Sequence, residues 1–175
     1  MAQAARSGNP DAWTDLVNRF VRPVHALCRR FLGNDAEAED ACQEVFMRLV
    51  QGIGSYEQQG RFAPWLFKLA ANVCRNYQRS SGRRRQREAT AALVPEPAPN
   101  PALEAEDRDS VTRLRDIIDA LPEQHSVPLW LKFQQGLTND EIAHVLEIPS
   151  ASVRVVLFRA LTQVRERAFS GRRSP

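Results

Sequence analysis

Four prolines at alternate positions divide this chain into two parts. Pro95, Pro97, Pro99 and Pro101 lie among alanine, glutamate and asparagine residues. Proline has no backbone N–H and fixes its own φ angle, so prolines at this density do not allow a packed helix. We therefore interpret residues 88–108 as a linker. The linker separates an N-terminal domain, residues 1–87, from a C-terminal domain, residues 109–175.

Apolar residues at steps of three and four predict helices throughout the N-terminal domain. We expect a first helix between Asn9 and Gly33 and a second one capped by Asn34 or Asp35. A third helix should start at Pro64, since proline suits the first position of a helix. This helix points its lysine and arginines outward.

The same periodicity predicts a second helical unit after the linker. Pro122 should separate two helices, and Pro128 should kink the second of them or place its start late. Gly136 ends that helix, and Ser150 is expected to cap a last helix that runs to about Phe169. The expected fold is therefore all-α, with two small helical domains joined by a Pro-rich linker.

Residues 137–154 have the pattern of a helix-turn-helix. Thr138 and Glu141 form a capping box, which predicts a short helix, and a turn at residues 147–149 leads into the longer last helix. In such a motif the second helix enters the DNA major groove with its N-terminal end. Small polar residues and arginines there favour contacts with bases and phosphates, and an ordinary helical hairpin is the alternative.

The charge distribution indicates two contacts with a polyanion. Residues 61–87 carry eight basic side chains and no acidic one, and residues 149–175 carry six basic and one acidic. Between them, residues 88–123 carry nine acidic and three basic side chains. Mixed charges are the norm on solvated surfaces, so such segregation favours nucleic-acid binding over simple solvated helix faces.

An acidic helix precedes the basic one. Residues 35–46 carry five acids and no base, with Gln43 and Glu44 expected on the exposed side. Such a helix could balance the neighbouring positive charge or dock on a protein partner, and periodicity leaves both readings open.

A glycine-bounded loop, residues 55–61, lies directly before the basic helix and contains Tyr56. An aromatic ring and amides beside positive charge suit the capture of an unstacked base, because the ring stacks and an amide reads the base edge. Tyr56 could supply the stacking face, and Asn72 and Asn76 could supply the amides. The alternative is that the neighbouring aromatic residues belong to the core, which we expect for Trp65.

Several functional classes are excluded by what the sequence lacks. His25 and Cys28 are one helical turn apart, but nothing nearby completes a four-ligand metal set, so we expect core packing. No nucleotide-binding loop or hydrolase motif is present, and we expect no enzyme activity, no cofactor and no metal. An odd count of three cysteines fits a reducing compartment. With no apolar run near the roughly eighteen residues of a membrane span, we expect a cytoplasmic protein without membrane insertion.

Three stretches together resemble the extracytoplasmic-function group of bacterial RNA polymerase sigma factors. They are residues 33–46 (GNDAEAEDACQEVF), residues 61–72 (RFAPWLFKLAAN) and residues 136–143, which follow Leu121-Pro122 and Pro128-Leu129. The resemblance covers nearly the whole chain in the same order. It implies an alternative sigma factor that binds core RNA polymerase, reads the −10 and −35 promoter elements and helps to melt the promoter. The alternative is a helix-turn-helix activator that does not replace sigma.

The resemblance also implies partners and site residues. The N-terminal domain is expected to bind the clamp of the polymerase largest subunit and the −10 element, and the C-terminal domain the flap of the second-largest subunit and the −35 element. An anti-sigma factor is a further expected partner. The implied clamp-binding residues are Asp40, Gln43, Glu44 and Arg48; those at the −10 element are Tyr56, Arg61, Lys68, Asn72, Arg75, Asn76 and Arg79; those at the −35 element are Thr138, Ser150, Ala151, Ser152, Arg154, Val155 and Arg159.

The chain departs from the family pattern at three places. Glu147 stands in the turn where the family often has glycine, which predicts an altered backbone there. Val155-Val156 replaces a polar–basic pair in the last helix, and Ser126 stands where arginine is common.

Overall fold

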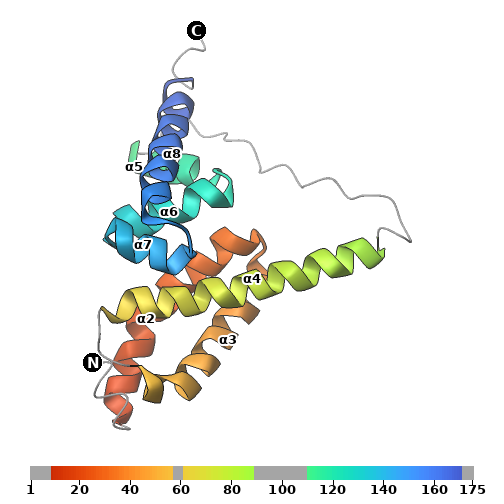
Figure 1. Ribbon diagram of the computed structural model, residues 1–175, viewed down its shortest axis with the longest axis vertical. Helices are drawn as coiled ribbons and strands as arrows, with labels where there is room; N and C mark the ends of the chain where they lie inside the picture. The colour runs from red at the N-terminus through yellow and green to blue at the C-terminus, as the bar shows by residue number, and fades with distance from the viewer. Residues whose placement is uncertain (1–8, 57–60, 89–109, 171–175) are drawn as a thin grey trace. The chain divides into compact units, whose positions relative to one another are not determined.

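The computed structural model describes residues 9–56, 61–88 and 110–170, and they form helices in two compact units (Figure 1). The main break between the units follows Gly82. No strand occurs among these residues, so the predicted all-α fold is confirmed. Most of the predicted linker, residues 89–108, lies outside the described part of the chain. The helices are α2 (Pro10–Leu32), α3 (Asp35–Gly52), η1 (Ile53–Ser55), α4 (Phe62–Glu88), α5 (Ser110–Asp119), α6 (Glu123–Phe133), α7 (Asn139–Leu146) and α8 (Ser150–Ser170).

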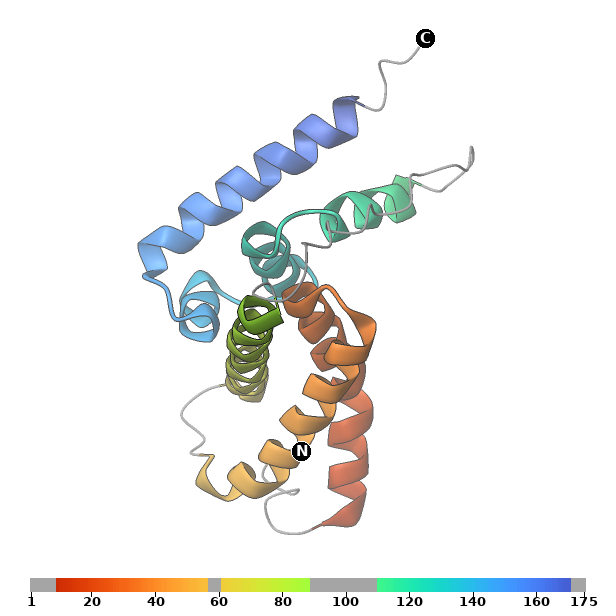
Figure 2. The same cartoon turned by 90° about the vertical axis from the view of Figure 1, so that its right-hand side faces the viewer.

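The first two helices begin and end at the residues that the sequence indicated. The Asn9 side chain accepts hydrogen bonds from the first backbone N–H groups of α2. Gly33 ends α2 with a φ of 68°, and its N–H donates to the Arg29 carbonyl over 2.8 Å. Asn34, not Asp35, then caps α3. This short connection turns the chain back, and Figure 2 shows α2 and α3 lying side by side.

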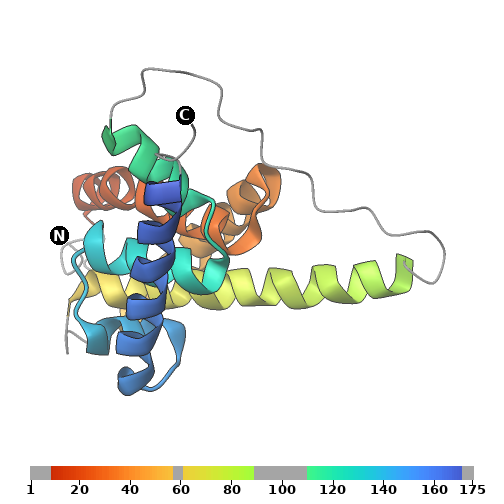
Figure 3. The same ribbon diagram turned by 90° about the horizontal axis from the view of Figure 1, so that it is seen from above.

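The start of α4 differs from the prediction by two residues. The helix begins at Phe62, and Pro64 is its third residue rather than its first. The first turn of a helix leaves its N–H groups without intrahelical partners, so a proline there removes no hydrogen bond. The helix then runs for 27 residues, and Figure 3 shows it along its length.

All three helices contribute to the core of the N-terminal unit. Phe20 of α2 packs edge-on against Phe67 of α4, with ring centroids 6.4 Å apart. Farther along α4, the Gln78 Nε2 donates to the Phe31 carbonyl of α2 over 2.8 Å. The fully buried large side chains here are Leu16, Val24, Leu27, Val45, Leu49, Leu66, Phe67 and Val73.

Three buried cysteines complete this core. Cys28 of α2, Cys42 of α3 and Cys74 of α4 are buried free thiols that pack as small apolar side chains, and the core position predicted for Cys28 is confirmed. A hydrogen bond with Cys74, together with burial, raises the pKa of Cys28. Burial, and next the charges of Cys28 and Glu39, raises the pKa of Cys42 to about 11.

The C-terminal unit is built around α6, whose central residues are almost all buried. The His125 Nδ1 lies 3.0 Å from the Gln163 Oε1 of α8, and Arg167 donates to the Ala120 carbonyl over 2.8 Å. These contacts tie the N-terminal end of α6, and the residues just before it, to α8. Pro128 does not delay the start of α6, which begins at Glu123. Pro128 is the sixth residue of α6 and has no backbone N–H to donate, so the helix loses one hydrogen bond there.

The helix-turn-helix is present with one correction. The backbone N–H of Thr138 donates to the Glu141 carboxylate over 2.7 Å, and the Glu141 N–H donates to the Thr138 hydroxyl over 3.2 Å, which confirms the capping box. The prediction that Ser150 caps α8 is wrong. Ser150 is the first residue of α8, and its hydroxyl donates to the Asp140 carboxylate of α7. The turn before it contains Glu147 with a φ of 57°, the altered backbone that the sequence predicted.

The raised pKa of Cys42 predicts a loss of stability at alkaline pH. A thiol whose pKa is raised on folding stabilises the fold fully below its unfolded value of 9.0, and this contribution disappears as the pH rises to about 11. Relative to Cys42→Ala, the free energy of unfolding should therefore fall by roughly 1–2 kcal/mol across this window, since solvent screens part of the shift. Urea unfolding followed by circular dichroism measures it, under reducing conditions. Parallel pH curves for the two proteins would contradict the prediction.

The left-handed backbone of Glu147 predicts that glycine stabilises this turn. A residue with a Cβ is strained at a φ of 57°, and glycine is not. Compared with Glu147→Ala, Glu147→Gly should raise the free energy of unfolding by about 0.5–1 kcal/mol, which is less than the relieved strain because glycine also gains freedom in the unfolded chain. Glu147→Ala is the matched control, since it removes the same carboxylate and keeps the Cβ. Equal stabilities of the two variants would show that the backbone carries no strain.

Candidate functional site

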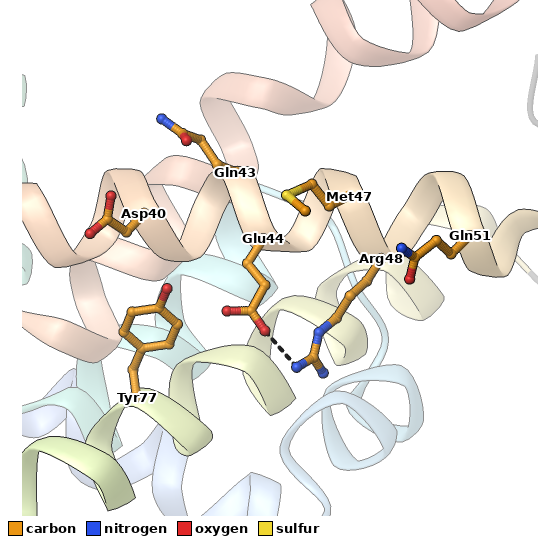
Figure 4. A pocket seen from close by; sticks show the side chains of 7 residues that line it. All are labelled: Asp40, Gln43, Glu44, Met47, Arg48, Gln51 and Tyr77. Carbon is orange, nitrogen blue, oxygen red and sulfur yellow. Dashed lines mark hydrogen bonds and ion pairs between the residues drawn. The ribbon is translucent and has the colours of Figure 1, made fainter.

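The four predicted residues of the acidic helix lie together on one side of α3. Figure 4 shows them around an open hollow between α3 and Tyr77 of α4. Asp40, Gln43 and Arg48 are exposed, and Glu44 is half-buried. The side chains that line the hollow are Asp40, Gln43, Glu44, Met47, Arg48, Gln51 and Tyr77.

Glu44 has two neighbours at this hollow. Arg48, one turn along α3, forms an ion pair with its carboxylate (Figure 4). Tyr77 of α4 lines the same hollow. Burial raises the pKa of Tyr77 first, and the Glu44 carboxylate raises it further, with a smaller contribution from Asp40. The ion pair with Arg48 therefore restrains the Glu44 carboxylate at the hollow.

Two apolar side chains on this face were missed by the sequence analysis. Met47 is 64% exposed and Val50 is 61% exposed. They follow Gln43 by four and seven residues, so they continue its line along the helix. The sequence does contain a clue to their exposure, because neither residue falls on the apolar stripe that is buried in α3. Exposed methionine beside charged groups is typical of a surface that binds protein.

A second hollow continues this surface onto α2. Val17 and Val21 of α2 and Phe46 of α3 line it, and Gln43 borders both hollows. The two valines are 37% and 38% exposed. The candidate protein-binding surface thus spans two adjacent helices.

The predicted stacking residue Tyr56 is buried, with 9% of its surface exposed. Its ring lies edge-on to Phe62, with centroids 5.5 Å apart, and its centroid lies 5.0 Å from that of Trp65. The ring is therefore packed against other rings and does not present an open face. Trp65, expected in the core, is half-buried in the same cluster. Residues 57–60 of the predicted loop lie outside the described residues.

The predicted polar and basic side chains of α4 recur at helical spacing. Arg61, Asn76 and Arg79 are exposed. Arg75 donates to the Asn72 Oδ1 over 2.6 Å, so that the Asn72 amide is fixed and its nitrogen can still donate to a base edge. Steps of three and four bring these groups to one side of the helix, which suits a track for a nucleic-acid strand. The members of this track are Lys68, Asn72, Arg75, Asn76 and Arg79.

The structure shows which hydrogen bonds the predicted residues of the helix-turn-helix already make and which side chains are exposed. The Thr138 hydroxyl accepts a hydrogen bond within the capping box, and it can still donate to a phosphate. The Ser150 hydroxyl donates to Asp140, which leaves it to act as an acceptor. Ser152 is half-buried, whereas Ala151, Arg154, Val155 and Arg159 are exposed on α8.

The start of α8 has one feature that favours a phosphate and one that opposes it. Its first turn holds no acidic residue, and the N-terminus of a helix carries a partial positive charge. The Asp140 carboxylate, which accepts from the Ser150 hydroxyl, places a negative charge beside the same turn. Across residues 9–56, 61–88 and 110–170, no group of His, Cys, Asp and Glu side chains could hold a metal ion. Among the helices that the structure describes, none has the length and hydropathy of a membrane span.

Comparison with known proteins gives two family matches on this one chain. The Sigma-70 region 2 family matches residues 16–84, and the Sigma-70, region 4 family matches residues 112–164. The RNA polymerase sigma factor CarQ of Myxococcus xanthus is 31% identical over 92% of this chain and 91% of its own length. The ECF RNA polymerase sigma-E factor of Haemophilus influenzae is 26% identical over 95% of this chain and 93% of its own.

Solved structures share the fold at lower sequence identity. The sigma factor RpoE of Bartonella quintana, solved in complex with the anti-sigma factor NepR, superposes with a TM-score of 0.70. The two sequences are 17% identical, and the match covers 89% of this chain and 95% of that one.

The position of Tyr77 beside the Glu44 carboxylate predicts a measurable titration. The chain has two tyrosines, so in a Tyr56→Phe background the ultraviolet absorbance reports Tyr77 alone. Its pKa should lie above the usual 10.0, because burial and the Glu44 carboxylate both oppose ionisation. Adding Glu44→Gln should lower the pKa towards that value. An unchanged titration after this second substitution would contradict the contact.

Proposed function

The chain belongs to the extracytoplasmic-function group of RNA polymerase sigma factors, and from this membership we propose how its two units divide the work of promoter recognition. The protein is an alternative sigma factor that binds core RNA polymerase and directs it to promoter DNA. The observation that carries this function is the presence of Sigma-70 region 2 and region 4 matches in order on one chain.

We assign residues 1–87 to a region 2-like domain, residues 88–108 to a linker and residues 109–175 to a region 4-like domain. The two family matches, residues 16–84 and 112–164, fall within these bounds and support the assignment. The segment between the matches contains the four alternate prolines, which support a linker.

The α3 face is the proposed docking surface for the clamp of the polymerase largest subunit. Its exposed Met47 and Val50 supply apolar area, and Asp40 and Gln43 supply polar contacts at the rim. Glu44 is paired with Arg48 before any partner arrives, which lowers the entropy lost on binding. The acidic surface repels phosphate, so it favours protein over DNA.

The α4 track is the proposed contact with the melted −10 strand. Lys68, Arg75 and Arg79 of this track, with Arg61 just before α4, would neutralise the backbone phosphates, while Asn72 and Asn76 read a base edge. For Tyr56 to stack on a captured base, its ring must leave Phe62 and Trp65. Each aromatic contact is worth about 0.5–1.5 kcal/mol and base stacking about 1–3 kcal/mol, so this exchange is energetically feasible.

The proposed −35 contact is the N-terminal end of α8, which would lie in the major groove. Arg154 and Arg159 carry hydrogen-bond donors that suit guanine or phosphate, and Thr138 suits a phosphate. The flap of the second-largest subunit is the proposed polymerase partner of this unit. An anti-sigma factor is the proposed inhibitor, supported by the RpoE relative of the same fold that was solved with one.

The relatives are regulatory DNA-binding proteins, and the proposal assigns no catalytic step to this chain. Such a protein must be where polymerase and promoter DNA are, so we propose that it acts in the cytoplasm. It needs no cofactor or metal of its own for the contacts described above.

Transcription with purified components tests the function. Core polymerase, with and without this chain, is given a pool of DNA fragments, and the 5′ ends of the transcripts are sequenced. The chain should create defined start sites behind a shared two-part promoter motif, with no other sigma present. Start sites that require a second sigma factor would instead identify an activator.

Two substitutions on α3 test the docking surface. Glu44→Lys and Met47→Glu should each weaken binding to core polymerase by roughly tenfold, because each alters a group at an interface that excludes water. Asp15→Lys, a charge reversal on the exposed side of α2, is the matched control and should bind normally. Helicity measured by circular dichroism checks the fold of each variant. Unchanged affinity of both α3 variants would refute this surface.

A further inference from the structure

The outward face of α8 is apolar at its centre, although the motif places this face against DNA. Val155 is 48% exposed, and Phe158 is 73% exposed. Phe158 is the most exposed of the large apolar side chains in the described part of the chain. The two residues are three positions apart, so they lie next to each other on the helix surface.

The buried side of α8 fixes which way these residues point. Val153, Leu157 and Ala160 are buried and hold the helix against its own unit. At about 100° per residue, Val155 and Phe158 lie on the opposite side of the helix. Figure 1 shows α8 in blue beside α6, against which it packs.

Two arginines flank this apolar centre. Arg154 and Arg159 are both exposed, and the helical rotation places one on each side of the line formed by Val155 and Phe158. The face therefore has positive, hydrogen-bonding edges and a middle without hydrogen-bonding groups. A base placed against the middle cannot replace its lost water contacts with protein hydrogen bonds, which disfavours a polar base edge.

The major groove offers one apolar group, the C5-methyl of thymine. Cytosine presents an amino donor, and guanine and adenine present ring and exocyclic polar atoms. Valine and phenylalanine at the centre of the reading face thus match thymine better than any other base. The arginines at the edges match guanine or phosphate on either side.

We propose that Val155 and Phe158 read thymine methyl groups, so that the −35 element recognised by this protein carries thymine between the positions that Arg154 and Arg159 contact. This specificity rests on the proposed function, because it requires α8 to lie in the major groove of the −35 element. It deepens that function by assigning one base to an apolar pair of side chains. The positive edges supply affinity and orientation, and the apolar centre supplies the choice of base.

Replacing thymine by deoxyuridine tests the inference, because it removes only the methyl group. The reconstituted holoenzyme first selects its preferred −35 element from duplexes randomised at these positions. Each thymine of the selected element is then replaced singly by deoxyuridine, and binding is measured. At one or two positions the loss should be about three- to fivefold, the value expected for exposing one buried methyl.

Variants of α8 connect that loss to the two side chains. Phe158→Ala and Val155→Ser should weaken binding to the thymine duplex and bring the ratio of thymine to deoxyuridine affinity close to one. Phe169→Ala is the matched control, since Phe169 is 56% exposed farther along the same helix. It should keep the wild-type ratio. Circular dichroism confirms that each variant remains helical.

The outcomes separate this inference from the proposed function. A holoenzyme that selects no −35 sequence contradicts the proposed function itself. A selected element with no thymine, or equal binding of thymine and deoxyuridine duplexes by the wild type, overturns the thymine assignment alone. The thymine assignment is also overturned if Phe158→Ala and Val155→Ser both retain the wild-type ratio of thymine to deoxyuridine affinity. In these latter cases the apolar centre of α8 is left for a protein partner.

Discussion

The burial of one narrow apolar stripe on α3 and one on α8 is the constraint on which the functional surfaces depend. On α3 the stripe is made by Ala38, Ala41 and Val45, and on α8 by Val153 and Leu157. Small residues in these stripes let the helices approach closely while a single face is buried. The opposite face of each helix is then fixed in direction and remains exposed. The surface residues we assign to partners are thus positioned by residues that touch no partner.

Backbone turns set the direction in which each fixed helix points. Gly33 ends α2 and Gly136 precedes α7, and both have φ angles in the left-handed region where glycine is favoured. Glu147 adopts the same conformation between α7 and α8 at a cost in strain. The turn of the helix-turn-helix thus carries a residue with a Cβ, although the backbone conformation there favours glycine.

Features that depend on near neighbours in the sequence could be predicted, and those that depend on distant ones could not. The capping box of Thr138 and Glu141 needs residues three apart, and it is present as expected. Ser150 was expected to cap α8, but Asp140, ten residues earlier, takes its hydroxyl. Tyr56 looked available for stacking because the sequence does not reveal that rings of α4 surround it.

The same limit explains which surface residues were found. Charged and amide side chains were identified as candidates, because a polar residue in a helix is expected at the surface. Met47 and Phe158 were not, because an apolar residue in a helical chain is first read as core. Only the structure shows that each lies outside the buried stripe of its own helix. An exposed apolar side chain flanked by charge then becomes the informative observation.

Electrostatics divides these two apolar faces between different classes of partner. Around Met47 the charged groups include Asp40 and Glu44, and a phosphate backbone would be repelled from them. Around Phe158 the charged groups are Arg154 and Arg159, which attract phosphate. Contacts with phosphates weaken steeply with salt, whereas burial of an apolar group does not. The apolar centre of α8 therefore contributes a part of recognition that persists when salt screens the arginines, and this part distinguishes one base from another.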